Sequence, residues 1–109
     1  MPRHRSELVI IYWRDIPAQV NAQVGRDRYQ VILPERFQRA IDQAKRKAHI
    51  YTADEDVAQW HREAQPLTGD PRTAADAASA ALEAEYTHDR LRELARAGGS
   101  ADPATGEPA

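Results

Sequence analysis

The sequence predicts an α+β domain: a small three-stranded antiparallel sheet packed by two short helices and one long C-terminal helix. Two observations support this fold class. Bulky apolar residues gather early in the chain, since 13 of the 18 Leu, Ile, Val and Phe residues lie within residues 1–51. Alanine, the strongest helix former, gathers late, since 13 of its 20 copies follow residue 63.

The first three elements are expected to be strands. Residues 8–13 are β-branched and aromatic at both parities, which is typical of a central strand covered on both faces. Residues 18–24 alternate between apolar and polar side chains, as a half-buried strand does, and residues 29–33 repeat this pattern more weakly. The connections are short and contain Pro17 and Gly25, which favours an antiparallel meander.

Two short helices are expected near residues 35–48 and 54–64, covering one face of the sheet. The first carries an apolar stripe at helical spacing between basic flanks. A capping-box pattern over residues 52–55 begins the second. At helical spacing, three apolar residues of the second helix share one face: Val57, Trp60 and Ala64.

One long alanine-rich helix is expected near residues 71–97. Asp70 is an N-cap residue followed by a proline, Gly98 and Gly99 mark the stop, and Thr87 offers a second N-cap where the helix can bend. Residues 7–97 are therefore expected to form a single domain. Residues 98–109 are rich in Gly, Ala, Pro and acidic residues, and are expected to form a disordered tail.

Composition excludes several kinds of chemistry. The chain has no cysteine, so it has no disulfide, zinc–thiolate site or thiol nucleophile. No serine lies in a glycine elbow, and the glycines form no phosphate loop. No metal site or cofactor is expected, because no two of the four histidines are three or four residues apart: His4, His49, His61 and His88. The sequence therefore predicts a protein that is not an enzyme.

The longest apolar run, residues 8–13, is far shorter than the ~20 residues of a membrane span. It is also short for the core of a signal peptide, and no small-residue cleavage site follows it. A cytoplasmic protein without membrane association is therefore expected, and the absence of cysteine fits a reducing compartment.

Charge is unevenly distributed, at +5 over residues 1–51 and −7 over residues 52–109. The first predicted helix carries five basic residues: Arg36, Arg39, Lys45, Arg46 and Lys47. Such a face can follow a phosphate backbone. Nucleic-acid binding is nevertheless the least favoured function, because the whole chain has a net charge of −2. A solvated helix face, or contact with the acidic C-terminal helix, explains the same pattern.

The segment from Tyr12 to Gln19 holds the densest cluster of residue types that commonly bind ligands. Tyr and Trp offer rigid contact area, and Arg14 and Asp15 can contact an anion or a donor. The residues alone favour a structural interpretation, in which Trp13 packs in the core and Arg14 and Asp15 fix a turn. The alanine-rich helix is a second candidate surface, which either packs on the sheet or docks a partner.

The run from Val9 to Val20, VIIYWRDIPAQV, resembles the signature of a family of short bacterial proteins described only as virulence factors. The resemblance covers roughly residues 7–98 and departs at residues 29–33, which are more β-like than in relatives. Further matching segments are Glu35–Phe37, Ala40–Asp42, Trp60, Glu83–Tyr86 and Leu91–Gly98.

The resemblance implies an accessory module. A similar domain is found within a larger virulence protein, and stand-alone members are encoded near folate- and corrinoid-dependent one-carbon enzymes. We therefore expect a non-catalytic accessory or adaptor protein of the bacterial cytoplasm that binds a partner protein. The alternative is a binding domain for a small molecule, either an anion or a pterin- or folate-like ligand stacked on Trp13.

The resemblance also makes a binding surface as good an explanation of the Tyr12–Gln19 segment as a structural turn. The expected roles are aromatic anchor, anion contact and turn fixation. The candidate binding residues are Tyr12, Trp13, Arg14, Asp15, Pro17, Gln19, Arg36 and Trp60.

Overall fold

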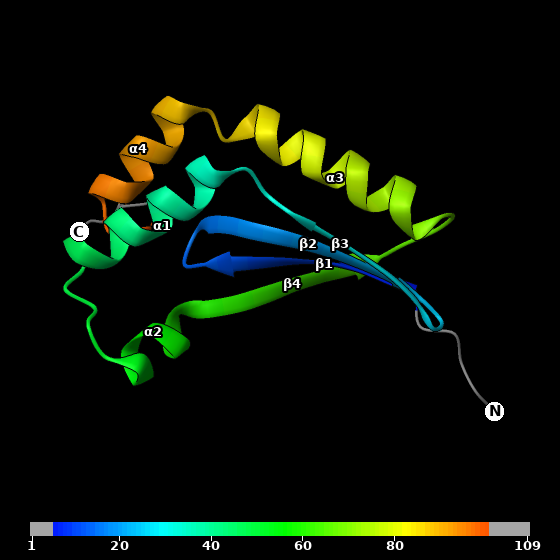
Figure 1. Ribbon diagram of the computed structural model, residues 1–109, viewed down its shortest axis with the longest axis horizontal. Helices are drawn as coiled ribbons and strands as arrows, with labels where there is room; N and C mark the ends of the chain where they lie inside the picture. The colour runs from blue at the N-terminus through cyan, green and yellow to red at the C-terminus, as the bar shows by residue number, and fades with distance from the viewer. Residues whose placement is uncertain (1–5, 101–109) are drawn as a thin grey trace, which may run out of the picture.

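A four-stranded antiparallel sheet carries helices on one of its faces in the computed structural model, which describes residues 6–100 (Figure 1). The order of strands across the sheet is β3-β2-β1-β4. In chain order the elements are β1 (Ser6–Trp13), β2 (Ile16–Val24), β3 (Asp27–Ile32), α1 (Glu35–Lys47), α2 (Ala53–Gln59), β4 (Trp60–Pro66), α3 (Pro71–Glu85) and α4 (His88–Arg96).

The α+β class and the predicted meander of β1, β2 and β3 are confirmed. β1 is a central strand, as expected, because β2 and β4 both pair with it in antiparallel register. Its register with β2 shifts between Ile11 and Tyr12, where Ala18 is the extra residue on β2. Such a bulge increases the local twist and re-aims the side chains beyond it.

The prediction of a helix over residues 54–64 is wrong in its second half. The capping box begins α2 as expected, but the helix ends at Gln59 and the chain continues as β4. β4 pairs with the free edge of β1 over its whole length, from Glu7 opposite Pro66 to Trp13 opposite Trp60. This distant pairing outweighs the local helical spacing of the apolar residues, and Val57 is left largely exposed.

The prediction of one long C-terminal helix is also wrong, because this segment forms two helices separated at Tyr86 and Thr87. Thr87 caps α4 by accepting a hydrogen bond from the Arg90 amide, so the second N-cap ends the helix rather than bending it. The break lets α3 lie along β2 and β3 while α4 packs on α1 (Figure 1). α4 then ends just before Gly98, as predicted.

The core lies between the sheet and three helices, α1, α3 and α4. Strand residues that face it include Leu8, Val20 and Ala22, and Phe37 and Ile41 of α1 pack against them. The expected cover by the second helix is wrong, because α2 lies beyond the end of the strands and contacts β4 (Figure 1). Among residues 6–100, no helix covers most of the opposite face of the sheet (Figure 1).

The ordered chain continues past Ala97, since Gly98 and Gly99 are buried. Residues 101–109 of the expected tail lie outside the described residues. Among the helices of residues 6–100, none is long and apolar enough to cross a membrane.

Candidate functional site

The segment from Tyr12 to Gln19 joins the end of β1 to the start of β2, and its tryptophan is inside the protein. Trp13 is 0% exposed. Its indole Nε1 donates a hydrogen bond of 2.9 Å to Oδ1 of Asp56, on α2. Its cross-strand neighbour, Trp60, is half-buried. A ligand therefore cannot stack on Trp13 in this conformation.

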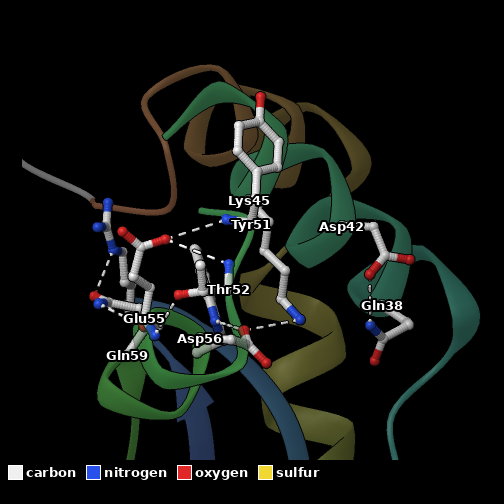
Figure 2. Close-up of polar contacts among 10 residues, drawn as sticks. Gln38, Asp42, Lys45, Tyr51, Thr52, Glu55, Asp56 and Gln59 are labelled. Carbon is white, nitrogen blue, oxygen red and sulfur yellow. Dashed lines mark hydrogen bonds and ion pairs between the residues drawn. The ribbon is translucent and has the colours of Figure 1, made fainter. Parts of the chain in front are cut away.

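Lys45, in the last turn of α1, pairs with Asp56 of this cluster (Figure 2). Its Nζ lies 2.9 Å from the same Asp56 oxygen that accepts the Trp13 hydrogen bond. The ammonium also lies 5.9 Å from the centre of the Trp13 ring and 5.8 Å from that of Trp60, within range of a cation–π attraction. Lys45 holds the pKa of Asp56 below its usual value, so this contact favours the folded state above acid pH.

Arg14 links the N-terminal turn to the C-terminal end of the domain. Its backbone has a φ of +54°, a left-handed conformation that few non-glycine residues adopt. The side chain compensates with two hydrogen bonds, from Nε to Gln59 (2.9 Å) and from Nη1 to the Gly98 carbonyl (3.0 Å). The Asp15 amide donates to the Gly99 carbonyl at 2.9 Å. These contacts tie the turn between β1 and β2 to the last two glycines of the described fold.

Two further candidates also make structural contacts. Pro17 is fully buried. Arg36 is on α1, and its side chain reaches the C-terminal end of α3. Its Nη2 donates to the carbonyl of Glu83 (2.9 Å), and its Nε and Nη2 donate to that of Tyr86 (3.4 and 3.3 Å). Arg36 thus satisfies carbonyls that the end of α3 leaves without helical partners. The structure does not bring Arg36 to the Trp13 cluster.

Tyr12 lies on the helix-covered face of β1, as Leu8 does, and stacks on His61 of β4. The two ring centres are 5.3 Å apart with an interplanar angle of 9°. The His61 Nε2 lies 2.6 Å from the Arg14 carbonyl oxygen, so Nε2 carries the hydrogen and donates it. Burial, reinforced by the nearby Tyr86 and Glu63, raises the pKa of Tyr12 to about 12.

This raised pKa predicts an alkaline loss of stability. Below pH 10, the ordinary tyrosine value, the phenol is protonated in both the folded and the unfolded chain. Between pH 10 and about 12 only the unfolded chain releases the proton of Tyr12, so the free energy of unfolding should fall across this range. The Tyr12→Phe variant should lose part of this fall, as measured by urea unfolding at a series of pH values. An unchanged decline in the variant would contradict the assignment.

The bare side of the sheet forms the second part of the site, and we call it the open face. Its side chains alternate with those that enter the core, because successive strand residues point to opposite faces. Registers place them in three rows across the strands. The open face consists of Glu7, Val9, Ile11, Gln19, Asn21, Gln23, Arg28, Gln30, Ile32, Arg62 and Ala64.

A hollow of about 430 Å³ lies on the open face above β1, β2 and β3. Val9 forms part of its lining and is only 4% exposed, although it is not part of the main core. Arg62 and Glu7, which flank Val9 along the strands, pair at 3.4 Å across it. The remaining lining is mainly polar and includes Asn21, Gln23, Arg28 and Gln30.

The open face can form many hydrogen bonds through its amide side chains. Gln19 donates to Asn21 (3.3 Å) and Gln23 to the Gly25 carbonyl (3.0 Å), which leaves further amide donors and acceptors on the same face. Ile32 lies in the row of Gln19 and is 64% exposed. Amides beside exposed apolar side chains suit non-covalent binding of a polar surface.

Of the eight candidate residues, only Gln19 lies on the open face. The alternation of residues 18–24 predicts a polar side on this strand, and that side is part of the open face. Arg62 was missed because residues 60–66 were expected to be helix and loop. Within residues 6–100, no three His, Asp or Glu side chains are grouped so that they could hold a metal ion.

Fold and site together define a class: small α+β domains whose antiparallel sheet is covered by helices on one face and bare on the other. Residues 11–95 match the family model described as Virulence factor. Because this match spans well over half of the chain, the protein belongs to the Virulence factor family, which confirms the resemblance. A search of the curated proteins and a search of the solved structures each gave no match.

Proposed function

We propose that this protein is a non-catalytic accessory protein of the bacterial cytoplasm that binds a partner protein through the open face. Three observations carry the proposal: within residues 6–100 most of this sheet face has no helical cover, it holds a hollow of about 430 Å³, and its Ile32 is 64% exposed. Exposed apolar surface with a polar surround is characteristic of interaction sites.

Three features support the open face over the Tyr12–Gln19 segment and the alanine-rich helix. Trp13 and Pro17 are buried, so most of that segment offers no surface. α3 already packs its Ala75, Ser79 and Leu82 against the domain, so its apolar side is occupied. The amide side chains of the open face can bond to the peptide groups of a partner.

The resemblance to proteins encoded near folate- and corrinoid-dependent enzymes suggests which partners to test first. A role in virulence is supported by the family description alone. Purified one-carbon enzymes from the same genome are therefore the first proteins to test for binding.

The Ile32→Asp variant should weaken partner binding by at least about tenfold, because an unpaired carboxylate would be buried in the interface. Val57→Asp, on α2 beyond the strands, is the matched control, because Val57 is also apolar and is 70% exposed. Both variants should keep the wild-type circular dichroism spectrum. Binding to a purified partner can be measured by isothermal titration calorimetry.

Equal binding by wild type and the Ile32→Asp variant would exclude the open face as the docking surface. A small molecule is the second candidate, because the hollow falls within the roughly 300–1,000 Å³ of ordinary ligand pockets. A pterin that raises the Tm of wild type but not of an Asn21→Ala, Gln30→Ala variant would favour this second function.

A further inference from the structure

A second hollow, of about 250 Å³, lies between α1 and α4 on the helical side of the sheet. Its apolar floor is Ala40 and Leu91, which are 6% and 3% exposed. Around this floor stand three arginines, a histidine and an amide: Arg36, Arg39, Arg92, His88 and Gln43. None of the described residues that line the hollow carries a carboxylate.

From this arrangement we propose that the hollow binds the phosphate group of a small phosphorylated metabolite. Arginine suits this group because its planar guanidinium donates two parallel hydrogen bonds to phosphate oxygens. A phosphomonoester carries a charge of about −1.5 to −2 at pH 7, which the basic lining can neutralise. The site lies on the other side of the sheet from the open face, so it does not rest on the proposed function.

Arg36 is held in place for this role. Its Nε and Nη2 are bonded to carbonyl oxygens of Glu83 and Tyr86, and its guanidinium lies 4.9 Å from the centre of the Phe37 ring. Nη1 has no hydrogen-bond partner among the described residues. A guanidinium fixed at one edge with donors left at the other loses little conformational entropy when it binds a ligand.

Arg39 and Arg92 are available to the same ligand. Arg39 pairs with Glu35 at 3.2 Å and Arg92 with Asp89 at 3.0 Å, in both cases within one helix and on the surface. Exposed pairs of this kind are worth about 0–1 kcal/mol, so exchange for a phosphate costs little. Gln43 and His88 supply further polar groups at the rim, and neither has a hydrogen-bond partner among the described residues.

The size of the hollow selects the ligand class. Pockets for drug-sized ligands measure roughly 300–1,000 Å³, so a hollow of about 250 Å³ suits a smaller ligand, such as a phosphate group with a few attached atoms. A nucleic acid would instead need a basic surface that extends along several phosphates. We therefore infer a small phosphorylated metabolite rather than a polymer.

The test uses three probes with the full chain: ribose 5-phosphate, inorganic phosphate and a short DNA oligonucleotide. Binding is followed by calorimetry and by NMR shifts of the His88 and Gln43 side chains. Wild type should bind ribose 5-phosphate more tightly than inorganic phosphate. The Arg39→Gln, Arg92→Gln variant should weaken this binding at least tenfold, since hydrogen bonds to charged groups contribute about 1.5–3 kcal/mol each.

Arg96→Gln is the matched control, because Arg96 is an exposed arginine on α4 outside the hollow. It should bind ribose 5-phosphate as wild type does. Any of four results would overturn the proposal: no binding of ribose 5-phosphate, equal affinity for inorganic phosphate, equal losses in the two variants, or tighter binding of the oligonucleotide. A failure to bind ribose 5-phosphate would count against this site alone, because partner binding by the open face is measured in a separate experiment.

Discussion

Replacement of Trp13 by alanine is expected to lower the free energy of unfolding by about 3–5 kcal/mol. The indole is fully buried among β1, β4 and α2, so its removal leaves a cavity as well as a loss of apolar burial. The variant also removes the donor to Asp56 and the ring beside Lys45. Domains of this size are stable by about 5–15 kcal/mol, so the loss is a large share of the total.

Urea unfolding followed by circular dichroism measures this effect, because the chain has only two tryptophans and fluorescence would change with the substitution itself. Trp60→Ala is the control, and it should cost less because Trp60 is only half-buried. Trp13→Phe should fall between wild type and Trp13→Ala. If Trp13→Ala and Trp60→Ala lower the free energy of unfolding equally, the deeper burial of Trp13 does not determine its contribution to stability.

Gly99→Ala is expected to cost about 2–5 kcal/mol, for two reasons that add. A Cβ at this position would lie 2.7 Å from Cζ3 and 3.1 Å from Cε3 of Trp13, closer than side chains approach one another. The indole cannot retreat, since it is enclosed on all sides. Residue 99 also has a φ of +96°, which an L-amino acid with a side chain adopts only with strain.

Gly69→Ala separates the two contributions. Gly69 has a similar φ of +86°, but a Cβ there would meet no atom within 4 Å. This control should therefore cost only the backbone strain, about 1–2 kcal/mol. Urea unfolding of both variants under the same conditions gives the difference. If the two substitutions cost the same, the close approach of Gly99 to Trp13 contributes nothing.

Elements whose structure depends on neighbouring residues could be predicted from the sequence. The alternation of residues 18–24 and the Asp70-Pro71 start of α3 are visible in a few neighbouring residues, and both predictions agree with the structure. Residues 60–66 were misassigned because their strand depends on pairing with β1, more than 40 residues away. A helical spacing of apolar residues cannot reveal that an edge of the sheet needs a partner.

The candidate site was predicted only in part for a similar reason. The sequence marked Tyr12–Gln19 as unusual, but it could not show that Trp13 and Pro17 are buried or that Arg14 reaches the Gly98 carbonyl. The polar parity of β2 indicated a polar sheet face. The hollow on that face needed the register of all four strands, which no short segment encodes.

The contact between the first turn and the last glycines has a consequence for synthesis of the protein. Asp15 and Trp13 are made early, but their partner Gly99 is among the last residues of the described fold to be made. At roughly 5–20 residues per second, the nascent chain spends several seconds with that side of the indole uncovered. A chain that stops short of Gly99 therefore exposes apolar surface, which would mark it for capture by chaperones or proteases.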